Sequence, residues 1–207
     1  MQNSKELFES YLNNVFCNLG KSWEVKKIGQ TCKVIAGQSP EGKFYNKLGQ
    51  GLPFYQGKKD FGDIFLKKPT VWTTQVTKEA EKGDILMSVR APVGPTNFAT
   101  EKICIGRGLA AIRVGDEIDR DFLFYFFKMF EDQLIGNSGA VFNSINKTQI
   151  ESIEIPISPL VQQKIIVKKL DQLSEKTQEL ESLYKQKLES IDELKKSILD
   201  KAFSNGL

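Results

Sequence analysis

The stretch LVQQKIIVKKLDQLSEKTQELESLYKQKLESIDELKKSILDKAF, Leu160–Phe203, decides the fold of this 207-residue chain. Its apolar residues recur at alternating steps of four and three, with Lys, Glu, Asp and Gln between them and no Gly or Pro. The apolar positions are Ile166, Leu170, Leu173, Leu180, Tyr184, Ile191, Leu194 and Ile198, and the polar residues Thr177 and Lys187 occupy the two remaining positions of the pattern. This spacing predicts one long α-helix with a narrow coiled-coil seam.

The predicted helix is long for a domain of this size. At ~1.5 Å per residue it forms a rod of about 65 Å, whereas a domain of the preceding length has a radius of gyration of ~14 Å. A single helix cannot bury such a seam on itself, and the chain has no other long heptad segment. We expect the seam to pair with another chain; packing of the helix along its own domain is the alternative.

The two ends of the chain resemble one another. Residues 6–18 read ELFESYLNNVFCN and residues 193–205 read ELKKSILDKAFSN. At one offset of 187 residues, Glu6, Leu7, Ser10, Leu12, Phe16 and Asn18 match Glu193, Leu194, Ser197, Leu199, Phe203 and Asn205. The match arises by chance between two amphipathic helix ends or is a repeat. A repeat predicts that the chain begins with the tail of one rod and ends with a second rod.

Length and composition predict three parts: a short N-terminal helix in 1–20, a globular domain in 21–159 and the long helix in 160–207. The sequence has neither an apolar run long enough to span a membrane nor a signal-peptide pattern, so we expect no membrane association. Cys17, Cys32 and Cys104 are odd in number and scattered, and histidine is absent. These features argue against a disulfide framework and a zinc site, and they favour the reducing cytoplasm.

The residues before the rod alternate between strand, loop and helix patterns, which predicts an α+β domain. The expected elements are a helix over 4–16, a strand-like segment over 23–35 that is broken near Gly29, loops over 37–62 with an edge strand at 52–56, a strand with apolar residues on both faces over 84–90, an aromatic core helix over 121–134 and a last strand over 153–157.

Charge is distributed unevenly along the chain. Residues 26–78 contain ten Lys against three acidic residues, residues 79–159 contain eight basic against twelve acidic residues, and the rod is close to neutral. A basic third of the domain indicates a surface that faces a polyanion. The alternative is an ordinary solvated lysine-rich face.

Motifs for catalysis are scarce. Without histidine, Ser-His and Cys-His machinery is excluded, and no Walker A sequence is present. Gly106-Arg107-Gly108-Leu109-Ala110-Ala111 fits G-x-G-x-x-A, but a strand pattern follows it where a dinucleotide site requires a helix. We therefore predict that the chain is not an enzyme by itself and holds no metal or cofactor.

Side chains suited to reading nucleic acid gather in the predicted loops. Lysines neutralise phosphates, and Arg, Gln and Asn present paired hydrogen-bonding groups to base edges. The candidate contacts are Gln56, Lys58, Lys59, Gln75, Arg90, Arg107, Ser138 and Asn143. Each alone is an ordinary surface residue; collectively they favour a DNA-binding surface over an active site.

Several motifs resemble one family. Residues 6–29 resemble the join between the central spacer and the second recognition domain of type I restriction–modification specificity subunits. KGDILMSVRAPVG (82–94) and IGRGLAAIR (105–113) look like core motifs of the target-recognition domains. SGAVFNSINKTQI (138–150) and IPISPLVQQKII (155–166) resemble the lead into the spacer helix, although residues 160–163 depart from the usual Pro-x-x-Glu-Gln form.

This resemblance implies a noncatalytic subunit that reads double-stranded DNA. Family members carry two recognition domains, each reading a half-site, and antiparallel spacer helices set the gap between them. They dock methyltransferase subunits and endonuclease/translocase subunits. S-adenosylmethionine, ATP and Mg are accordingly expected on those partners and not on this chain.

This chain departs from the family in size, because it has one recognition domain, one full spacer and the tail of another. It is expected to be a natural half-subunit, a product of truncation or a cloned half. If half-subunits pair antiparallel as a homodimer, twofold symmetry predicts an inverted-repeat target with a fixed gap. The alternatives are a coiled-coil adaptor that does not read DNA and a fragment of a DNA methyltransferase or nuclease.

Overall fold

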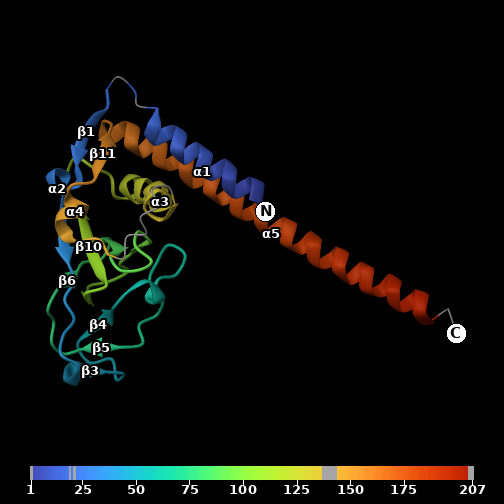
Figure 1. The fold of residues 1–207 in the computed structure, drawn as a ribbon, viewed down its shortest axis with the longest axis horizontal. Coiled ribbons are helices and arrows are strands. Elements are labelled where there is room, and N and C mark those ends of the chain that lie inside the picture. Colours follow the sequence, from blue (N-terminus) through green and yellow to red (C-terminus); the bar gives the residue numbers. More distant parts are fainter. Residues whose placement is uncertain (1, 19, 21, 137–143, 205–207) are drawn as a thin grey trace.

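The computed structural model describes residues 2–18, 20, 22–136 and 144–204, which form an α+β body with a long helix projecting from it (Figure 1). This architecture confirms the predicted fold class. Helix α1 (Gln2–Cys17) lies along the first half of α5 (Leu160–Ser204), and the N-terminus lies partway along α5. The second half of α5 extends away from the body.

Three sheets make up the body. A two-stranded sheet pairs β1 (Glu24–Lys27) with β11 (Glu154–Ile157). A four-stranded sheet has the order β2 (Cys32–Ala36), β10 (Leu109–Val114), β7 (Ile85–Ser88) and β8 (Thr96–Phe98). A five-stranded sheet has the order β3 (Tyr45–Asn46), β5 (Trp72–Thr73), β4 (Leu52–Tyr55), β9 (Ile103–Ile105) and β6 (Glu79–Ala80). The short helices are α2 (Ile28–Thr31), η1 (Gly42–Phe44), η2 (Lys58–Asp60) and α4 (Lys147–Glu151).

The four-stranded sheet separates two apolar cores. Side chains alternate across a strand, and β7 shows this clearly: Ile85 and Met87 face one core, whereas Leu86 faces the other. The first core lies beneath helices α1, α3 (Arg120–Gly136) and α5, and the second includes residues of the five-stranded sheet. The prediction that this strand is buried on both faces is confirmed.

Helix α3 supplies the aromatic part of the first core, as its sequence predicts. The Asp119 carboxylate caps the helix by accepting hydrogen bonds from the backbone N–H groups of Asp121 and Phe122, at 3.0 and 3.1 Å. Phe122 and Phe127 are almost completely buried. The aromatic residues of this helix therefore belong to the hydrophobic core and do not form a platform for stacking bases.

The structure has the expected break in segment 23–35 and corrects one expectation about strands. The single helical turn α2, which contains Gly29, separates β1 from β2 and places them in different sheets. Strand β4 is internal in its sheet and not an edge strand. It tolerates Pro53, which has no N–H to donate, because its first two residues pair with β5 and its last two with β9.

The seam of α5 divides into two halves. Leu170 is fully buried, Ile166 packs against the first core, and Leu173 lines a groove with Leu7 and Tyr11 of α1. The expected partner in another chain is thus replaced, over this half, by elements of the same chain. The α1 segment was too short to reveal this role through a heptad pattern.

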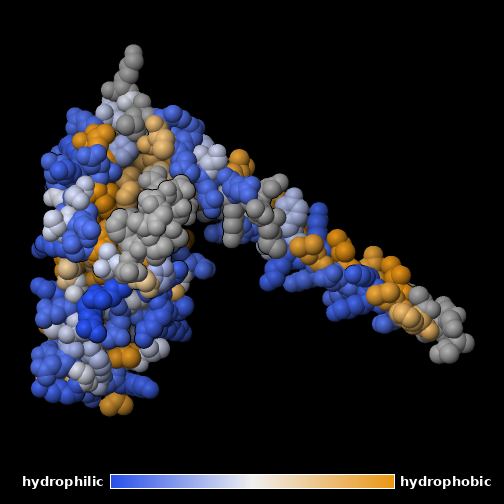
Figure 2. Space-filling model, in the orientation of Figure 1, coloured by the Kyte–Doolittle hydropathy of each residue, from blue (hydrophilic) through white to orange (hydrophobic). Residues whose placement is uncertain are grey.

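The second half of the seam is exposed. Leu180, Tyr184, Ile191, Leu194 and Ile198 are between 46 and 61 % exposed. Figure 2 shows the apolar patches along this part of the rod. Among the described residues, no helix is both long enough and apolar enough to cross a membrane.

Candidate nucleic-acid interface

The turn Gly106–Gly108 between β9 and β10 brings three distant segments together. The Gly106 N–H donates to the carbonyl of Tyr55 at 2.8 Å, and the Val89 N–H donates to the carbonyl of Gly108 at 3.0 Å. A Cβ on Gly108 would lie 2.2 Å from the Gln56 carbonyl oxygen. Three predicted contacts, Gln56, Arg90 and Arg107, therefore lie on or next to segments that converge on this turn.

Two of the predicted lysines lie in the loop that follows Gln56 in the sequence. Lys58 and Lys59 are exposed on η2, whose loop is held by the Asp60 carboxylate. That carboxylate accepts hydrogen bonds from the N–H groups of Gln56 and Gly57, at 2.8 and 3.3 Å. The loop is thus tied to the end of β4, which sets its lysines beside the Gly106–Gly108 turn.

The sequence analysis missed two residues that support this surface. The Ser39 hydroxyl accepts a hydrogen bond from the Arg107 N–H at 3.3 Å, and the Lys67 ammonium donates to the Lys59 carbonyl at 3.2 Å. Their partners are 68 and 8 residues away in the sequence. No local pattern marks such a contact, so only the fold reveals it.

Gln75 lies on a neighbouring loop. Its side-chain oxygen accepts a hydrogen bond from the Glu41 N–H at 3.2 Å, which joins the loop to the segment that carries Ser39. Gln75 is half-buried, and its carbonyl oxygen therefore supports the loop. Its amide nitrogen is the group that remains suited to a base edge.

Some cations of the body form ion pairs, whereas among the described residues the predicted cations of this surface do not. Lys58, Lys59, Arg90 and Arg107 are exposed, and within the described part of the chain none of them forms an ion pair. Lys102 and Arg113, by contrast, pair with carboxylates at 2.7 and 2.8 Å. Unpaired cations beside Gln side chains suit a phosphate backbone with base edges next to it.

Two predicted contacts, Ser138 and Asn143, lie outside the described residues. The described residues that follow them return to the same surface: Ser144 bridges to Arg90, and the Ile145 N–H donates to the Val89 carbonyl at 3.0 Å.

The buried Tyr55 side chain supports the loop that carries Lys58 and Lys59, because its hydroxyl donates a hydrogen bond to the Lys67 carbonyl at 2.9 Å. Burial, with the nearby charges of Glu101 and Asp60, raises the pKa of Tyr55 to about 12. The unfolded chain ionises near pH 10, so the stabilisation from neutral Tyr55 is complete below pH 10 and disappears as the pH rises to 12. We expect the free energy of unfolding to fall by an extra ~2 kcal/mol across this range relative to Tyr55→Phe, measured by urea denaturation of both proteins. Equal slopes would contradict the assignment.

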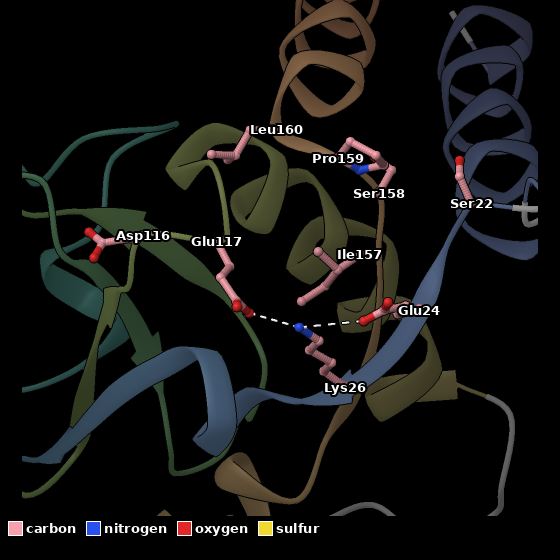
Figure 3. A pocket seen from close by; sticks show the side chains of 9 residues that line it. All are labelled: Ser22, Glu24, Lys26, Asp116, Glu117, Ile157, Ser158, Pro159 and Leu160. Atoms are coloured by element: carbon pink, nitrogen blue, oxygen red, sulfur yellow. Dashed lines mark hydrogen bonds and ion pairs between the residues drawn. The ribbon is translucent and has the colours of Figure 1, made fainter.

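Another hollow lies apart from this surface, at the base of the rod. It has a volume of about 360 Å³ and is lined partly by Glu24, Asp116 and Glu117 (Figure 3). Lys26 crosses it to pair with Glu117 at 2.8 Å and Glu24 at 3.5 Å, and the hydrogen bond that its ammonium donates to Glu117 raises the Lys26 pKa. Its acidic lining repels phosphate, so it does not belong to the DNA surface. Among described residues, no acidic or Cys cluster has the arrangement of a metal site.

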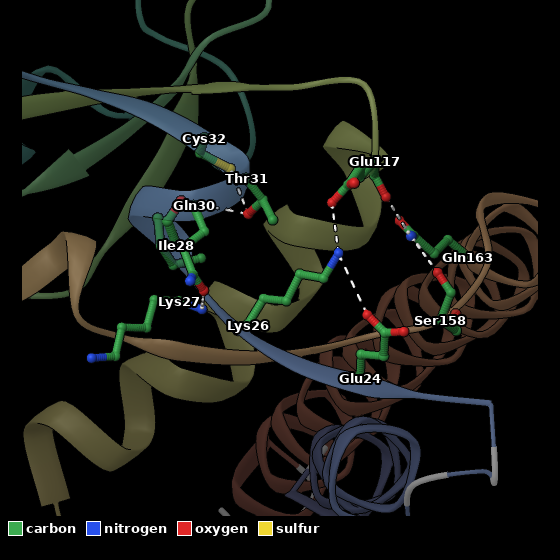
Figure 4. A network of polar contacts seen from close by, with 10 residues as sticks. All are labelled: Glu24, Lys26, Lys27, Ile28, Gln30, Thr31, Cys32, Glu117, Ser158 and Gln163. Carbon is green, nitrogen blue, oxygen red and sulfur yellow. Dashed lines mark hydrogen bonds and ion pairs between the residues drawn. The ribbon is translucent and has the colours of Figure 1, made fainter.

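Behind this hollow, Gln163 joins the rod to the body. It is fully buried, and its side-chain oxygen accepts a hydrogen bond from the Asp119 N–H at 2.7 Å. Its side-chain nitrogen donates to the carbonyls of Glu117 and Ser158, at 3.0 and 2.6 Å (Figure 4). All of its donors and acceptors that face the body are satisfied. Gln163 therefore fixes where α5 leaves the body.

Comparisons with known proteins agree with this geometry. Residues 20–190 match the family described as "Type I restriction modification DNA specificity domain". The putative type I restriction enzyme MjaX specificity subunit of Methanocaldococcus jannaschii is 40 % identical over 204 residues, which cover 95 % of this chain and 47 % of that protein. The MjaIX specificity subunit of the same organism is 30 % identical over 70 % of this chain and 36 % of its own length.

Solved structures give the same result. A chain from a structure titled for the complex assembly and conformational transition of the type I R-M system has a TM-score of 0.90 and 40 % identity, covering 98 % of this chain and 52 % of its own. The HsdS subunit of Thermoanaerobacter tengcongensis has a TM-score of 0.79 and 40 % identity, covering 86 % and 45 %. The chain thus spans about half the length of these relatives. It belongs to the type I restriction–modification specificity-subunit family and carries one DNA specificity domain.

Proposed function

We propose that this chain reads one half-site of a double-stranded DNA target as a noncatalytic specificity subunit. The observation that carries the proposal is the convergence of Gln56, Arg90 and Arg107 on the Gly106–Gly108 turn, beside the unpaired Lys58 and Lys59. The lysines supply a salt-dependent attraction to phosphates, and Gln and Arg read base edges. Gln75, Ser138 and Asn143 extend the same assignment.

The partners that follow from family membership are methyltransferase subunits and endonuclease/translocase subunits. S-adenosylmethionine, ATP and Mg would bind to those partner subunits and not to this chain. The rod supports such docking because its exposed half projects away from the body (Figure 1). Pairing of two copies through Leu180, Tyr184, Ile191, Leu194 and Ile198 would place two recognition domains at a fixed separation, and the target would then be a gapped inverted repeat.

Selection of binders from a pool of random DNA duplexes, with the chain purified together with its methyltransferase partner, tests this function. An inverted repeat with constant spacing supports DNA reading and pairing together. A single ungapped half-site supports the reading alone. Absence of enrichment even at low salt contradicts the function and favours a coiled-coil adaptor.

The lysine assignment predicts a sequence-independent effect. Lys58→Ala should weaken binding to every duplex by a similar factor and reduce the slope of log affinity against log salt by about 1, because one phosphate contact is lost. Fluorescence anisotropy of the selected duplex and of a scrambled duplex, over a series of salt concentrations, measures both quantities.

Two variants serve as controls. Lys102→Ala removes a lysine that is ion-paired and lies at the other end of β9, so it should leave both quantities unchanged. Arg107→Ala should instead reduce discrimination between the two duplexes by ~1–3 kcal/mol. A change of sequence preference in Lys58→Ala would show that Lys58 contacts bases.

A further inference from the structure

A small hollow lies within the candidate DNA surface, between β3, β4 and the loop that follows β4. It has a volume of about 70 Å³. This is far below the ~300 Å³ at which small-molecule pockets begin, so the hollow can take one edge of a base but not a whole ligand. Gln56 and Lys59, two of the predicted DNA contacts, are among its lining residues. The hollow is therefore part of the surface that is proposed to bind DNA.

One wall of the hollow is apolar and firmly held. The rings of Tyr45 and Phe54 stack with their centroids 4.8 Å apart, and Val71 lines the hollow with them. The Tyr45 hydroxyl donates to the Pro40 carbonyl at 2.9 Å, and the Phe54 N–H donates to the Val71 carbonyl at 2.9 Å. This wall suits a C–H group on the edge of a base.

The hollow is also lined by one carboxylate, that of the half-buried Asp60. The Asp60 N–H donates to the Gly57 carbonyl, and the Asp60 carbonyl accepts from the Lys67 N–H, both at 3.0 Å. Its Oδ2 accepts from the N–H groups of Gln56 and Gly57 at 2.8 and 3.3 Å. Its Oδ1 forms no hydrogen bond or ion pair with the described residues. One oxygen thus holds the loop, and the other is available to a ligand.

The loop does not require the Asp60 side chain to be charged. An asparagine oxygen could accept the same two backbone hydrogen bonds. A carboxylate close to Lys59 also weakens the attraction of this surface for phosphate. In a DNA interface, a carboxylate is suited instead to an amino group on the edge of a base. The charge of Asp60 is therefore explained by a base and not by the DNA backbone.

Of the four DNA bases, cytosine alone places an amino group beside a C–H group on its major-groove edge. Adenine and guanine present the N7 acceptor, and thymine presents the O4 acceptor, which a carboxylate oxygen would repel. We propose that Asp60 Oδ1 accepts a hydrogen bond from N4 of a cytosine whose C5–H lies against Tyr45 and Phe54. Cytosine recognition rests on the proposed half-site reading and names one base pair that this surface reads.

Asp60→Asn tests this role, because its amide oxygen can hold the loop while an amino donor replaces Oδ1. The wild-type chain and the variant, each with the methyltransferase partner, select binders from the same pool of random duplexes. At one position, wild type should prefer cytosine by about tenfold or more over every other base. Asp60→Asn should lose this preference and leave the other positions unchanged.

Asp63→Asn is the matched control for the selection. Asp63 is an exposed carboxylate three residues further along the same loop, and its side chain forms no hydrogen bond or ion pair within the described part of the chain. Removal of its charge should leave the selected sequence identical to that of wild type.

A modified duplex gives a second readout. Replacement of the cytosine by pyrimidin-2-one removes only the amino group, so wild type should bind about tenfold or more weakly. Asp60→Asn should bind both duplexes with affinities within about twofold of each other. Fluorescence anisotropy measures all four affinities, and the same analogue outside the selected sequence controls for altered base pairing. General damage to the loop would lower the affinity of Asp60→Asn for both duplexes but would leave the wild-type difference in place.

Three results would overturn the role of Asp60: no cytosine preference in wild type, an unchanged preference in Asp60→Asn, or equal losses on pyrimidin-2-one in both proteins. If wild type and Asp60→Asn select the same sequence, half-site reading stands and only the role of Asp60 fails. If wild type selects no duplex, half-site reading fails, and cytosine recognition fails with it. The two failures are therefore distinguishable.

Discussion

Gly108→Ala is expected to lower the free energy of unfolding by about 3 kcal/mol and to weaken binding to the selected DNA at least a hundredfold. The added methyl carbon would lie 2.2 Å from the Gln56 carbonyl oxygen and 3.7 Å from the α carbon of Gly57. A backbone atom cannot rotate aside as a flexible side chain can. The turn or the end of β4 must therefore move.

The consequence for binding follows from the position of Gly108. Its carbonyl holds the Val89 N–H, and the neighbouring Gly106 N–H donates to Tyr55. Displacement of the turn separates Arg107 from Gln56 and shifts the strand end that precedes Arg90. Base reading requires these side chains in one register, so specific binding should fall more than nonspecific binding does.

Gly57→Ala is the matched control. Gly57 lies next to the same carbonyl in the sequence, but a Cβ there meets no atom within 4 Å, and its φ of 177° is an extended conformation that alanine adopts. This variant should keep wild-type stability and affinity to within about 0.5 kcal/mol. Chemical denaturation and duplex binding compare all three proteins. Similar results for both variants would show that the close approach at Gly108 does not limit the fold.

Gln163→Leu should lower the free energy of unfolding by about 3 kcal/mol. Leucine fills a similar volume, but it leaves the Asp119 N–H and the carbonyls of Glu117 and Ser158 without their partner. Gln163 is fully buried, so water does not replace these bonds without rearrangement, and each orphaned group costs about 1 kcal/mol or more. Thermal or urea unfolding measures the loss.

The same variant tests the placement of the rod. Because Gln163 joins α5 to the loop before α3, its loss should loosen the angle of the rod and broaden the range of gap lengths in the selected DNA. Gln162→Leu is the control: Gln162 is adjacent, only half-buried, and its side chain forms no hydrogen bond to the described residues. An unchanged gap in Gln163→Leu would show that other contacts set the angle.

Local sequence pattern was sufficient to predict those elements that periodicity or composition defines. The period of the seam in residues 160–203 fixed the long helix, and the density of aromatics in 121–134 fixed α3 as a core helix. The close approach of Gly108 to the Gln56 carbonyl, by contrast, was not visible in the sequence. Type I specificity-subunit membership, inferred from short motifs, is confirmed over residues 20–190.

The DNA surface could be anticipated by residue type but not by geometry. Lys, Arg and Gln in polar loops indicated a nucleic-acid surface, yet nothing in the sequence distinguishes the unpaired Lys58 from the paired Lys102. Ion pairs between residues far apart depend on how strands are ordered in the sheet. Ser39 and Lys67 were missed for the same reason.

By itself, the sequence determined where helices and strands lie, which of their faces are apolar and which family the chain belongs to. Tertiary structure alone decided that α1 covers the first half of the seam, that β4 is internal, that Gln163 is buried and that three loops meet at Gly108. Periodicity shows that a face must be covered but not which neighbour covers it. That choice depends on contacts between residues distant in the sequence, where the chain's own folding places them side by side.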